Sequence, residues 1–372
     1  CGLIRETLIR TRWYKFRLIK KGTVIKLNAV SNYQDQAPPL ILDKELKKLP
    51  NVGIVQNGIM FDDYVQKNAS WLFYERYLRN NNIDYGYYDI LNSDWIQKGK
   101  EFNIILWHVN STPVDLYIAR SKIYVLEKIL GITCFPSFHE IWQYEDKSRA
   151  SYLYKFYGLP EIPTFATNSY KEAIKKTKAF KYPLVAKMNT GAGSMGVELI
   201  KNYAQAKRYI KQSFGIKGRR TIWPYYRQKD YVLFQEFIDD AEFDLRVMII
   251  GRKAFGYYRY PNKGDFRASG TGKIEKKAIP LDAIRIAVDV KDKLQSRLIG
   301  IDLLFSKKWQ KYFIIETSLF NQIDTPEQLV INGIPGYYDI SDINNIVFKP
   351  GKFWIHELVA EEIIKEWCQN YS

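Results

Sequence analysis

The segment that most constrains the fold of this chain is a glycine-rich loop between two apolar runs. The first run covers residues 182–187 and ends in Lys187, and the second covers residues 197–200. Because glycine has no Cβ, such a loop can bring backbone N–H groups close to phosphate oxygens, and the lysine adds a positive charge to the same site. The pattern therefore predicts a strand, a phosphate-covering loop and a second strand. The loop residues are Gly191, Gly193, Ser194 and Gly196.

Two other nucleotide-binding motifs share this spacing but differ in context. Gly191-x-Gly193-x-x-Gly196 matches the dinucleotide fingerprint, yet a Rossmann site needs a helix that opens directly from the loop, and here a helix is predicted only from about Tyr203. A protein kinase has its glycine loop before the strand lysine, whereas Lys187 precedes the loop here, and neither His-Arg-Asp nor Asp-Phe-Gly follows. For this segment taken alone, a plain glycine-rich hairpin turn is the alternative.

The composition and the alternation of elements predict an α/β protein of more than one domain. The chain has 372 residues, of which 46% are hydrophobic and 26% charged, as in a globular protein of two or three domains. Strand and helix patterns alternate between residues 49 and 140, which predicts a small doubly wound parallel sheet. A basic lead-in, 1–48, precedes it. Strands are expected at 23–27, 52–55, 85–91 and 102–107, and helices at 64–78 and 117–130.

Three segments after the glycine loop complete a set of four motifs. Residues 233–250 form a strand, an acidic turn and a second strand; residues 265–272 form a basic glycine-rich loop; residues 300–318 form two apolar strands ending in the carboxylates Asp302 and Glu316. In this order the set resembles the ATP-grasp superfamily, over about residues 141–340. It looks closest to the ribosomal-protein glutamate ligases and to ATP-grasp proteins of bacterial polysaccharide gene clusters.

The resemblance implies that residues 141–372 form a two-lobed ATP-grasp domain that binds ATP. Its interlobe hinge is expected near 235–238, where backbone groups would pair with the adenine edge, and Asp244 or Glu236 would accept hydrogen bonds from the ribose. Lys147 resembles the helix-start residue that reaches the phosphates. The residues implied in nucleotide binding are Lys147, Lys187, Gly191, Gly193, Ser194, Gly196, Gln235, Glu236, Phe237, Ile238 and Asp244.

The same resemblance implies a magnesium site and two catalytic arginines. Asp302 and Glu316 would supply hard oxygen ligands for Mg²⁺, with Ser318 in the place where many family members carry Asn. Arg246 and Arg267 would neutralise the charge that develops during phosphoryl transfer. Alternatively, the two carboxylates belong to a solvated rim, and Arg246 is their structural salt-bridge partner.

The charge balance favours an anionic partner. Lys and Arg number 56 against 40 Asp and Glu, a formal charge of +16, which suits a nucleotide, a nucleic acid, an anionic glycan or an acidic membrane face. A solvated basic surface is the plainer interpretation. No apolar run is long enough to span a membrane. The three cysteines are far apart and the three histidines lack metal spacing, so neither a disulfide framework nor a zinc site is predicted, and a cytoplasmic location is expected.

These features together predict an ATP- and Mg²⁺-dependent carboxylate–amine ligase that acts through an acyl phosphate. Its partners would be a small-molecule or glycan-linked carboxylate and an amine, with a role in cell-surface polysaccharide synthesis by analogy alone. One alternative is a kinase with the same fold that phosphorylates a hydroxyl group. Another is a non-catalytic protein that binds an anionic polymer, although a nucleic acid is not favoured.

Overall fold

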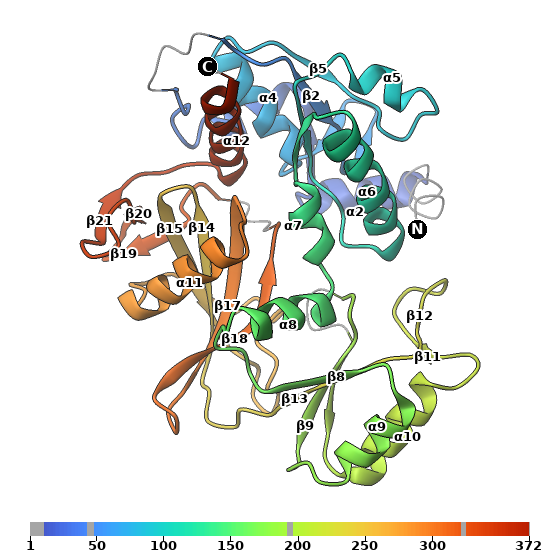
Figure 1. The fold of residues 1–372 in the computed structure, drawn as a ribbon. Coiled ribbons are helices and arrows are strands. Elements are labelled where there is room, and N and C mark those ends of the chain that lie inside the picture. The colour runs from blue at the N-terminus through green and yellow to red at the C-terminus, as the bar shows by residue number, and fades with distance from the viewer. Residues whose placement is uncertain (1–10, 43–47, 192–195, 321–324, 372) are drawn as a thin grey trace.

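The computed structural model describes residues 11–42, 48–191, 196–320 and 325–371. They form a mixed α/β fold built around three main sheets (Figure 1). A four-stranded parallel sheet lies at the top of Figure 1, a four-stranded antiparallel sheet at the bottom, and an eight-stranded antiparallel sheet between them on the left.

The parallel sheet confirms the predicted α/β alternation. Its strand order is β5-β2-β6-β7, every pairing is parallel, and β2 and β6 are buried along their whole length. Its strands are β2 (Val52–Val55), β5 (Tyr85–Tyr87), β6 (Ile104–Trp107) and β7 (Thr133–Phe135). Its helices are α4 (Ser70–Asn80), α5 (Trp95–Gly99) and α6 (Pro113–Tyr124), the last extended by a π-helical turn, Val125–Ile129.

The helix predicted over 64–78 is wrong in its first part. Residues Tyr64–Gln66 form strand β4, which pairs with β1 and β3, so their backbone groups serve a sheet instead of a helix. The remaining elements of this region are α2 (Arg12–Lys20), β1 (Val24–Lys26), a 3₁₀ turn (Leu27–Ala29), α3 (Val30–Gln34) and β3 (Met60–Phe61). The strand expected at 23–27 is β1, and its pairing joins the lead-in to the chain that follows.

The lower sheet contains the glycine loop. Its order is β10-β9-β13-β8, and β9 and β10 form the predicted hairpin, with Lys187 opposite Val197. The turn needs glycine at Gly196, since its φ is +79° and a Cβ there would lie 2.1 Å from the Met188 side chain. The elements are β8 (Thr164–Thr167), α9 (Tyr170–Thr177), β9 (Leu184–Lys187), β10 (Val197–Ile200), α10 (Tyr203–Ser213), β11 (Arg219–Arg220), β12 (Arg227–Gln228) and β13 (Val232–Glu236).

The large sheet has the order β18-β17-β14-β15-β20-β19, with β16 paired to β15 and β21 to β20. Asp302 lies in the middle of β17, so the prediction that it ends a strand is wrong; it faces Glu316 on β18 across an irregularity in the register. The elements are β14 (Asp244–Ile250), β15 (Lys253–Arg259), β16 (Ile274–Glu275), α11 (Leu281–Lys293), β17 (Leu298–Ser306), β18 (Lys311–Ser318), β19 (Leu329–Ile331), β20 (Ile334–Asp339) and β21 (Val347–Pro350).

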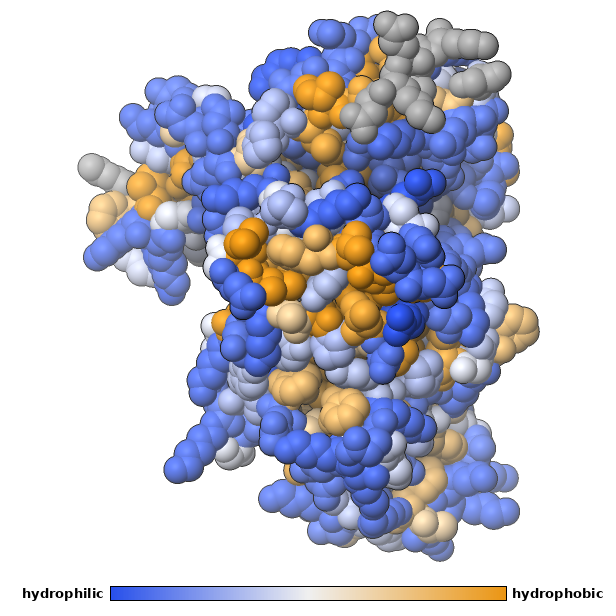
Figure 2. All heavy atoms as spheres, turned by 90° about the vertical axis from the view of Figure 1, so that its left-hand side faces the viewer, coloured by the Kyte–Doolittle hydropathy of each residue, from blue (hydrophilic) through white to orange (hydrophobic). Residues whose placement is uncertain are grey.

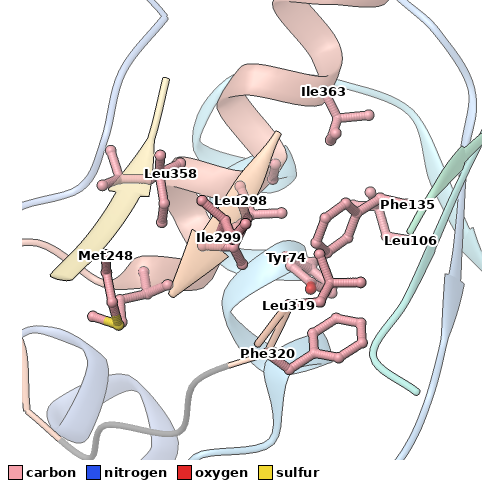
Figure 3. Packing of buried hydrophobic residues seen from close by; sticks show 14 of the residues in the cluster. Tyr74, Leu106, Phe135, Met248, Leu298, Ile299, Leu319, Phe320, Leu358 and Ile363 are labelled. Atoms are coloured by element: carbon pink, nitrogen blue, oxygen red, sulfur yellow. The ribbon is translucent and has the colours of Figure 1, made fainter. Parts of the chain in front are cut away.

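One apolar core joins the parallel sheet to the large sheet. Figure 3 shows Leu106 and Phe135 of the parallel sheet close to Leu319 and Phe320, which follow β18. Helix α12 (Ile355–Tyr371) packs against α4, where the buried Arg76 and Glu357 form an ion pair of 2.6 Å. The two sheets are therefore held together by shared burial. Helices α7 (Phe138–Gln143) and α8 (Lys147–Phe156) connect this core to the lower sheet.

The surface has the expected hydrophilic character. Figure 2 shows hydrophilic side chains over most of one face, with apolar side chains gathered near its middle. In the described ranges, no helix is both long and apolar enough to cross a bilayer.

Candidate active site

A cavity of about 770 Å³ lies where the three sheets meet. Most of the residues singled out in the sequence line it, although they come from segments up to 171 positions apart, as Lys147 and Ser318 do. Gly193 and Ser194 lie outside the described residues, and Gly196 is described but does not line the cavity. The predicted residues that do line it are Lys147, Lys187, Gly191, Gln235, Glu236, Phe237, Ile238, Asp244, Arg246, Arg267, Asp302, Glu316 and Ser318.

Lys187, at the end of β9, is a buried cation that forms no direct ion pair within the described part of the chain. Only 5% of the residue is exposed, and no described residue forms an ion pair or hydrogen bond with its ammonium group. Burial lowers the pKa of Lys187 to about 8, because the charged form loses its water. A buried ammonium group without a direct contact to a described carboxylate suits an anionic ligand.

Lys147, the first residue of α8, is held by several groups. Asp146 caps this helix by accepting a hydrogen bond from the Arg149 amide. The Lys147 ammonium donates to Glu316 Oε1 and to the Gly191 carbonyl, each at 3.1 Å. Burial alone would lower the pKa of Lys147, but the nearby carboxylates raise it. Lys147 is therefore a fixed positive charge beside the glycine loop.

Four charged residues on three adjacent strands of the large sheet form one buried cluster. The strand registers place Arg246 opposite Asp302 and Asp244 opposite Arg259. Arg246 donates to both oxygens of Asp302, at 2.6 and 2.7 Å, and Arg259 reaches Asp244 and Asp302 at 2.6 and 2.7 Å. Arg246 thus forms the salt bridge with Asp302 that was expected if its role is structural. It also lines the cavity.

The pKa values of this cluster split as expected for two carboxylates that share two guanidinium groups. Against the effect of burial, Arg246 and Arg259 hold the pKa of Asp302 well below its usual range. Burial and the charge of Asp302 raise the pKa of Asp244. Asp302 is therefore the ionised member at neutral pH.

The oxygen atoms around Asp302 suit a hard cation. Asp302 Oδ1 accepts one hydrogen bond from Arg246 and keeps a further lone pair. Among the described residues, Glu316 accepts through Oε1 from Lys147, and its Oε2 has no such donor. The Ser318 hydroxyl donates to the Phe320 carbonyl at 3.1 Å, which leaves its oxygen able to accept. Within the described ranges, no cluster of three acidic, histidine or cysteine side chains could hold a metal ion. A cation here would complete its coordination with oxygens of a ligand.

The middle of the cavity has apolar walls, and residues of the basic loop 265–272 also line the cavity. Ile162 and Val185 contribute from the lower side, and Leu304 and Ile315 from the large sheet. Residues 235–238 pass between them as the chain crosses from β13 towards β14. A flat ring can lie in this slot.

Arg267, on the loop 265–272, is more exposed than the other cavity arginine. It donates to both oxygens of Asp265, at 3.0 and 2.8 Å, and its side chain is 44% exposed. The rings of Phe266 and Phe237 meet edge to face at 5.5 Å, so this loop contacts the hinge segment. The nearby Ser269 also lines the cavity.

Sequence reasoning missed a second wall, which comes from the parallel sheet. His108, Asn110 and Ser111 follow the carboxyl end of β6 and line the cavity. The available signal was that polar residues directly after a parallel strand gather at the ligand-binding edge of the sheet. His108 Nδ1 lies 2.6 Å from Ser70 Oγ, and its ring lies 4.2 Å from that of Phe320. Burial, together with nearby His356, lowers the pKa of His108 to about 3, so the ring is neutral.

Two further charged residues were also missed. Glu145 lines the cavity with a φ of +53°, and its Oε2 accepts from the Gly191 amide at 3.4 Å. Burial raises the pKa of Glu145. Arg259 belongs to the charged cluster without lining the cavity, and only the strand register reveals its position.

Comparisons with known proteins agree with this geometry. Residues 161–330 match the model of a protein family, the RimK-like ATP-grasp domain. The chain is 26% identical over 228 residues to alpha-aminoadipate–LysW ligase LysX of Saccharolobus solfataricus, a match that covers 60% of this chain and 72% of that protein.

Solved structures share the fold. The D-alanine–D-alanine ligase from Bacillus anthracis complexed with ATP matches with a TM-score of 0.53 at 12% identity, over 87% of this chain and 98% of that one. The N5-carboxyaminoimidazole synthetase from Staphylococcus aureus complexed with ADP matches with a TM-score of 0.50 at 10% identity, over 74% of this chain and 72% of that one. These likenesses concern the fold, and with the domain match they confirm the predicted fold class.

Proposed function

We propose that this chain, whose residues 161–330 match the RimK-like ATP-grasp domain, is an ATP- and Mg²⁺-dependent carboxylate–amine ligase. Such an enzyme forms ADP and creates a carbon–nitrogen bond; LysX and the D-alanine–D-alanine ligase, which this chain resembles, are ligases.

The observation that supports the proposal is the buried ammonium of Lys187, which makes no direct ion pair or hydrogen bond with any described residue. Together with Lys147 and Arg246, it directs positive charge into one cavity. A polyphosphate supplies the missing negative charge, and the Gly191 end of the glycine loop lies against the same space. We propose that Gly193 and Ser194, which lie outside the described residues, also belong to the phosphate-binding loop.

The base and the ribose of the nucleotide would lie in the apolar slot next to the hinge. The Glu236 amide already donates to the Pro163 carbonyl at 3.0 Å, so a donor for adenine would come from a later amide, such as that of Ile238. Asp244 is engaged by Arg259, which leaves the exposed Glu236 as the better acceptor for the ribose hydroxyls. Of Asp244 and Glu236, we therefore propose Glu236 as the residue that accepts hydrogen bonds from the ribose.

The residues present fit a magnesium ion. Asp302, Glu316 and Ser318 would hold it through oxygen atoms, the donor type that this ion prefers. When bound, Mg²⁺ would screen the phosphate charges and polarise the terminal phosphoryl group. Glu316 keeps Oε2 for this purpose because Lys147 binds its other oxygen.

The arginines would act on the two chemical steps. In the first step a carboxylate oxygen of the acceptor attacks the γ-phosphorus, the bond to the bridging oxygen breaks, and ADP leaves. In the second step the amine attacks the carbonyl carbon of the acyl phosphate, loses a proton, and inorganic phosphate leaves. Arg246 is oriented by Asp302, and Arg267 lies on the covering loop, so both can neutralise oxygen charge as it develops.

The acceptor would bind in the half of the cavity lined by the parallel sheet. His108, Asn110 and Ser111 offer neutral polar groups there, next to the Phe320 ring. We place a small-molecule or glycan-linked carboxylate in this half, with a cytoplasmic reaction in cell-surface polysaccharide synthesis. The polysaccharide role rests only on the resemblance to proteins of such gene clusters.

Hydroxylamine trapping tests the proposal. The protein is incubated with Mg-ATP, a library of carboxylates and hydroxylamine, which acts as the amine and converts an acyl phosphate into a hydroxamate. We expect one class of carboxylate to yield hydroxamate, ADP and inorganic phosphate in equal amounts. Phosphate that stays on the acceptor would identify a kinase instead. A Glu316→Ala protein that keeps its full function would identify a non-catalytic binder.

A further inference from the structure

Helix α2 turns one face into the protein and is held firmly there. Tyr14 and Leu18 pack against Val24 and Phe61 of the adjoining small sheet and against Ile59, which precedes β3. At the edge of this face, Lys15 forms an ion pair of 2.7 Å with Asp62 and places its ammonium 5.1 Å from the centre of the Phe61 ring. The helix is therefore already formed and oriented before any partner binds.

The opposite face of α2 is apolar and exposed. Trp13 is 68% exposed, Phe16 64% and Ile19 39%. These three residues are spaced by three positions, so their side chains lie along one side of the helix. Single exposed apolar residues are common, but a row of three with two large aromatic rings marks an interaction surface. We call this row the aromatic face.

Cations surround the aromatic face. Arg17, Lys20 and Lys21 are exposed, and none forms an ion pair with a residue in the described part of the chain. The Arg17 guanidinium lies 5.5 Å from the centre of the Trp13 ring. Helical spacing places Lys20 between Trp13 and Phe16 as seen around the axis, so charge and apolar surface are interleaved.

We propose that the aromatic face of α2 binds the surface of an anionic lipid bilayer. Trp and Phe side chains insert at the boundary between headgroups and acyl chains, and lysine and arginine extend from the same face to lipid phosphates. The net charge of +16 adds a long-range attraction to such a surface. This site lies outside the catalytic cavity and does not depend on the ligase proposal.

Two other partners fit the face less well. The centre of a protein interface is depleted in lysine, whereas Lys20 lies within this face. A nucleic acid would stack bases on the aromatic rings. The aliphatic Ile19 cannot stack on a base, and the Arg17 guanidinium already lies over the Trp13 ring. A bilayer surface accepts the aliphatic, aromatic and cationic groups at once.

Vesicle co-sedimentation tests the proposal with the full chain. The protein is mixed, at moderate salt, with vesicles about 100 nm in diameter. The vesicles contain phosphatidylcholine alone, or phosphatidylcholine with roughly a third of the lipid replaced by phosphatidylglycerol. We expect binding to the anionic vesicles, and a loss of about tenfold or more in the double variant Trp13→Ala/Phe16→Ala, because two interfacial aromatic side chains are removed. The matched control is Phe156→Ala/Trp309→Ala, which removes the same residue types from other exposed positions and should bind as the native chain does.

Charge is tested in the same way. Lys20→Glu/Lys21→Glu should reduce binding to anionic vesicles by about tenfold or more, and Lys207→Glu/Lys211→Glu, an equal charge change on α10, should reduce it much less. Quenching of tryptophan fluorescence by brominated phosphatidylglycerol should decrease in Trp13→Phe. Circular dichroism and thermal unfolding serve as checks on folding.

Several results would overturn the proposal. They are the absence of vesicle binding by the native chain, equal losses in the test and control variants, and quenching that Trp13→Phe does not change. If the aromatic variant instead abolishes a dimer seen in sedimentation velocity, without vesicle binding, the occupant is a second copy. If Lys20→Glu/Lys21→Glu abolishes binding to a short DNA duplex, again without vesicle binding, the partner is a nucleic acid.

Discussion

Replacing Lys187 with methionine should make the unliganded protein more stable while it weakens nucleotide binding. In the folded chain the ammonium is buried without a described partner, and its pKa is lowered from 10.5 to about 8. A difference of this size corresponds to about 3 kcal/mol of destabilisation of the charged form relative to the unfolded chain. Methionine has a similar length and no charge, so it removes this penalty.

The gain in stability should depend on pH in a defined direction. Between pH 8 and pH 10.5 the unfolded chain binds more protons at Lys187 than the folded chain does, so the stability of the native protein rises with pH in this window. The advantage of Lys187→Met should therefore be nearly complete at pH 7 and almost absent at pH 10.5. At pH 7 it should raise the Tm by roughly 3 to 6 °C.

Nucleotide affinity should change in the opposite direction. A hydrogen bond between a charged group and a phosphate contributes about 1.5–3 kcal/mol, which corresponds to a loss of about 10- to 150-fold in ATP affinity. Differential scanning fluorimetry without nucleotide and isothermal titration calorimetry with ATP measure the two effects. Lys201→Met, at an exposed lysine beside β10, is the matched control and should change neither. Unchanged ATP affinity in Lys187→Met, or a lower Tm at pH 7, would refute the reasoning.

Three further predictions concern the same cavity. Glu316→Gln should lower Mg²⁺-dependent phosphate release by about 100-fold or more, because the amide is a poorer ligand for a cation that provides several kcal/mol of charge stabilisation. ATP should still bind in the absence of metal. A magnesium titration of turnover checks this, and turnover at the wild-type rate would contradict it. Asp302→Asn should destabilise the protein by about 3 kcal/mol, because it leaves buried guanidinium groups without their counter-charge; urea unfolding measures it against Asp282→Asn, whose side chain is 83% exposed and which should change stability little. The Kd for ATP should rise about tenfold between pH 7 and pH 9, because bound phosphates favour protonated Lys187 and Lys187 in the nucleotide-free protein loses its proton near pH 8. In Lys187→Met, calorimetry should show a Kd that does not change over the same pH range.

The parts of the site that could be predicted from sequence carry a local signal. Lys187 ends an apolar run before three glycines, and Lys147 follows Asp146, a good helix N-cap. Asp302 and Glu316 interrupt apolar strands, where a carboxylate is conspicuous. In each case the helix or strand, and the unusual side chain on it, can be identified from residues within about ten positions or from the order of the motifs.

Other parts of the cavity carry no such signal. His108 looks like any residue after a strand, and Arg259 looks like the end of an exposed hairpin. Their roles follow from which strand lies beside which. The same limit explains the error over 64–78, where the pairing of β4 with β1 and β3 competes successfully with a helical pattern of apolar residues.

By itself, the sequence determined the ATP-grasp fold class, through the resemblance carried by the order of its four motifs. It also determined the glycine-rich hairpin, because backbone geometry and apolar periodicity act over short distances. Only the tertiary structure decided that Asp302 is shared between Arg246 and Arg259 and that a wall from the parallel sheet closes the cavity. The physical reason is that strand register and the packing of one sheet on another depend on burial summed over the whole core, in which no single segment specifies its distant neighbour.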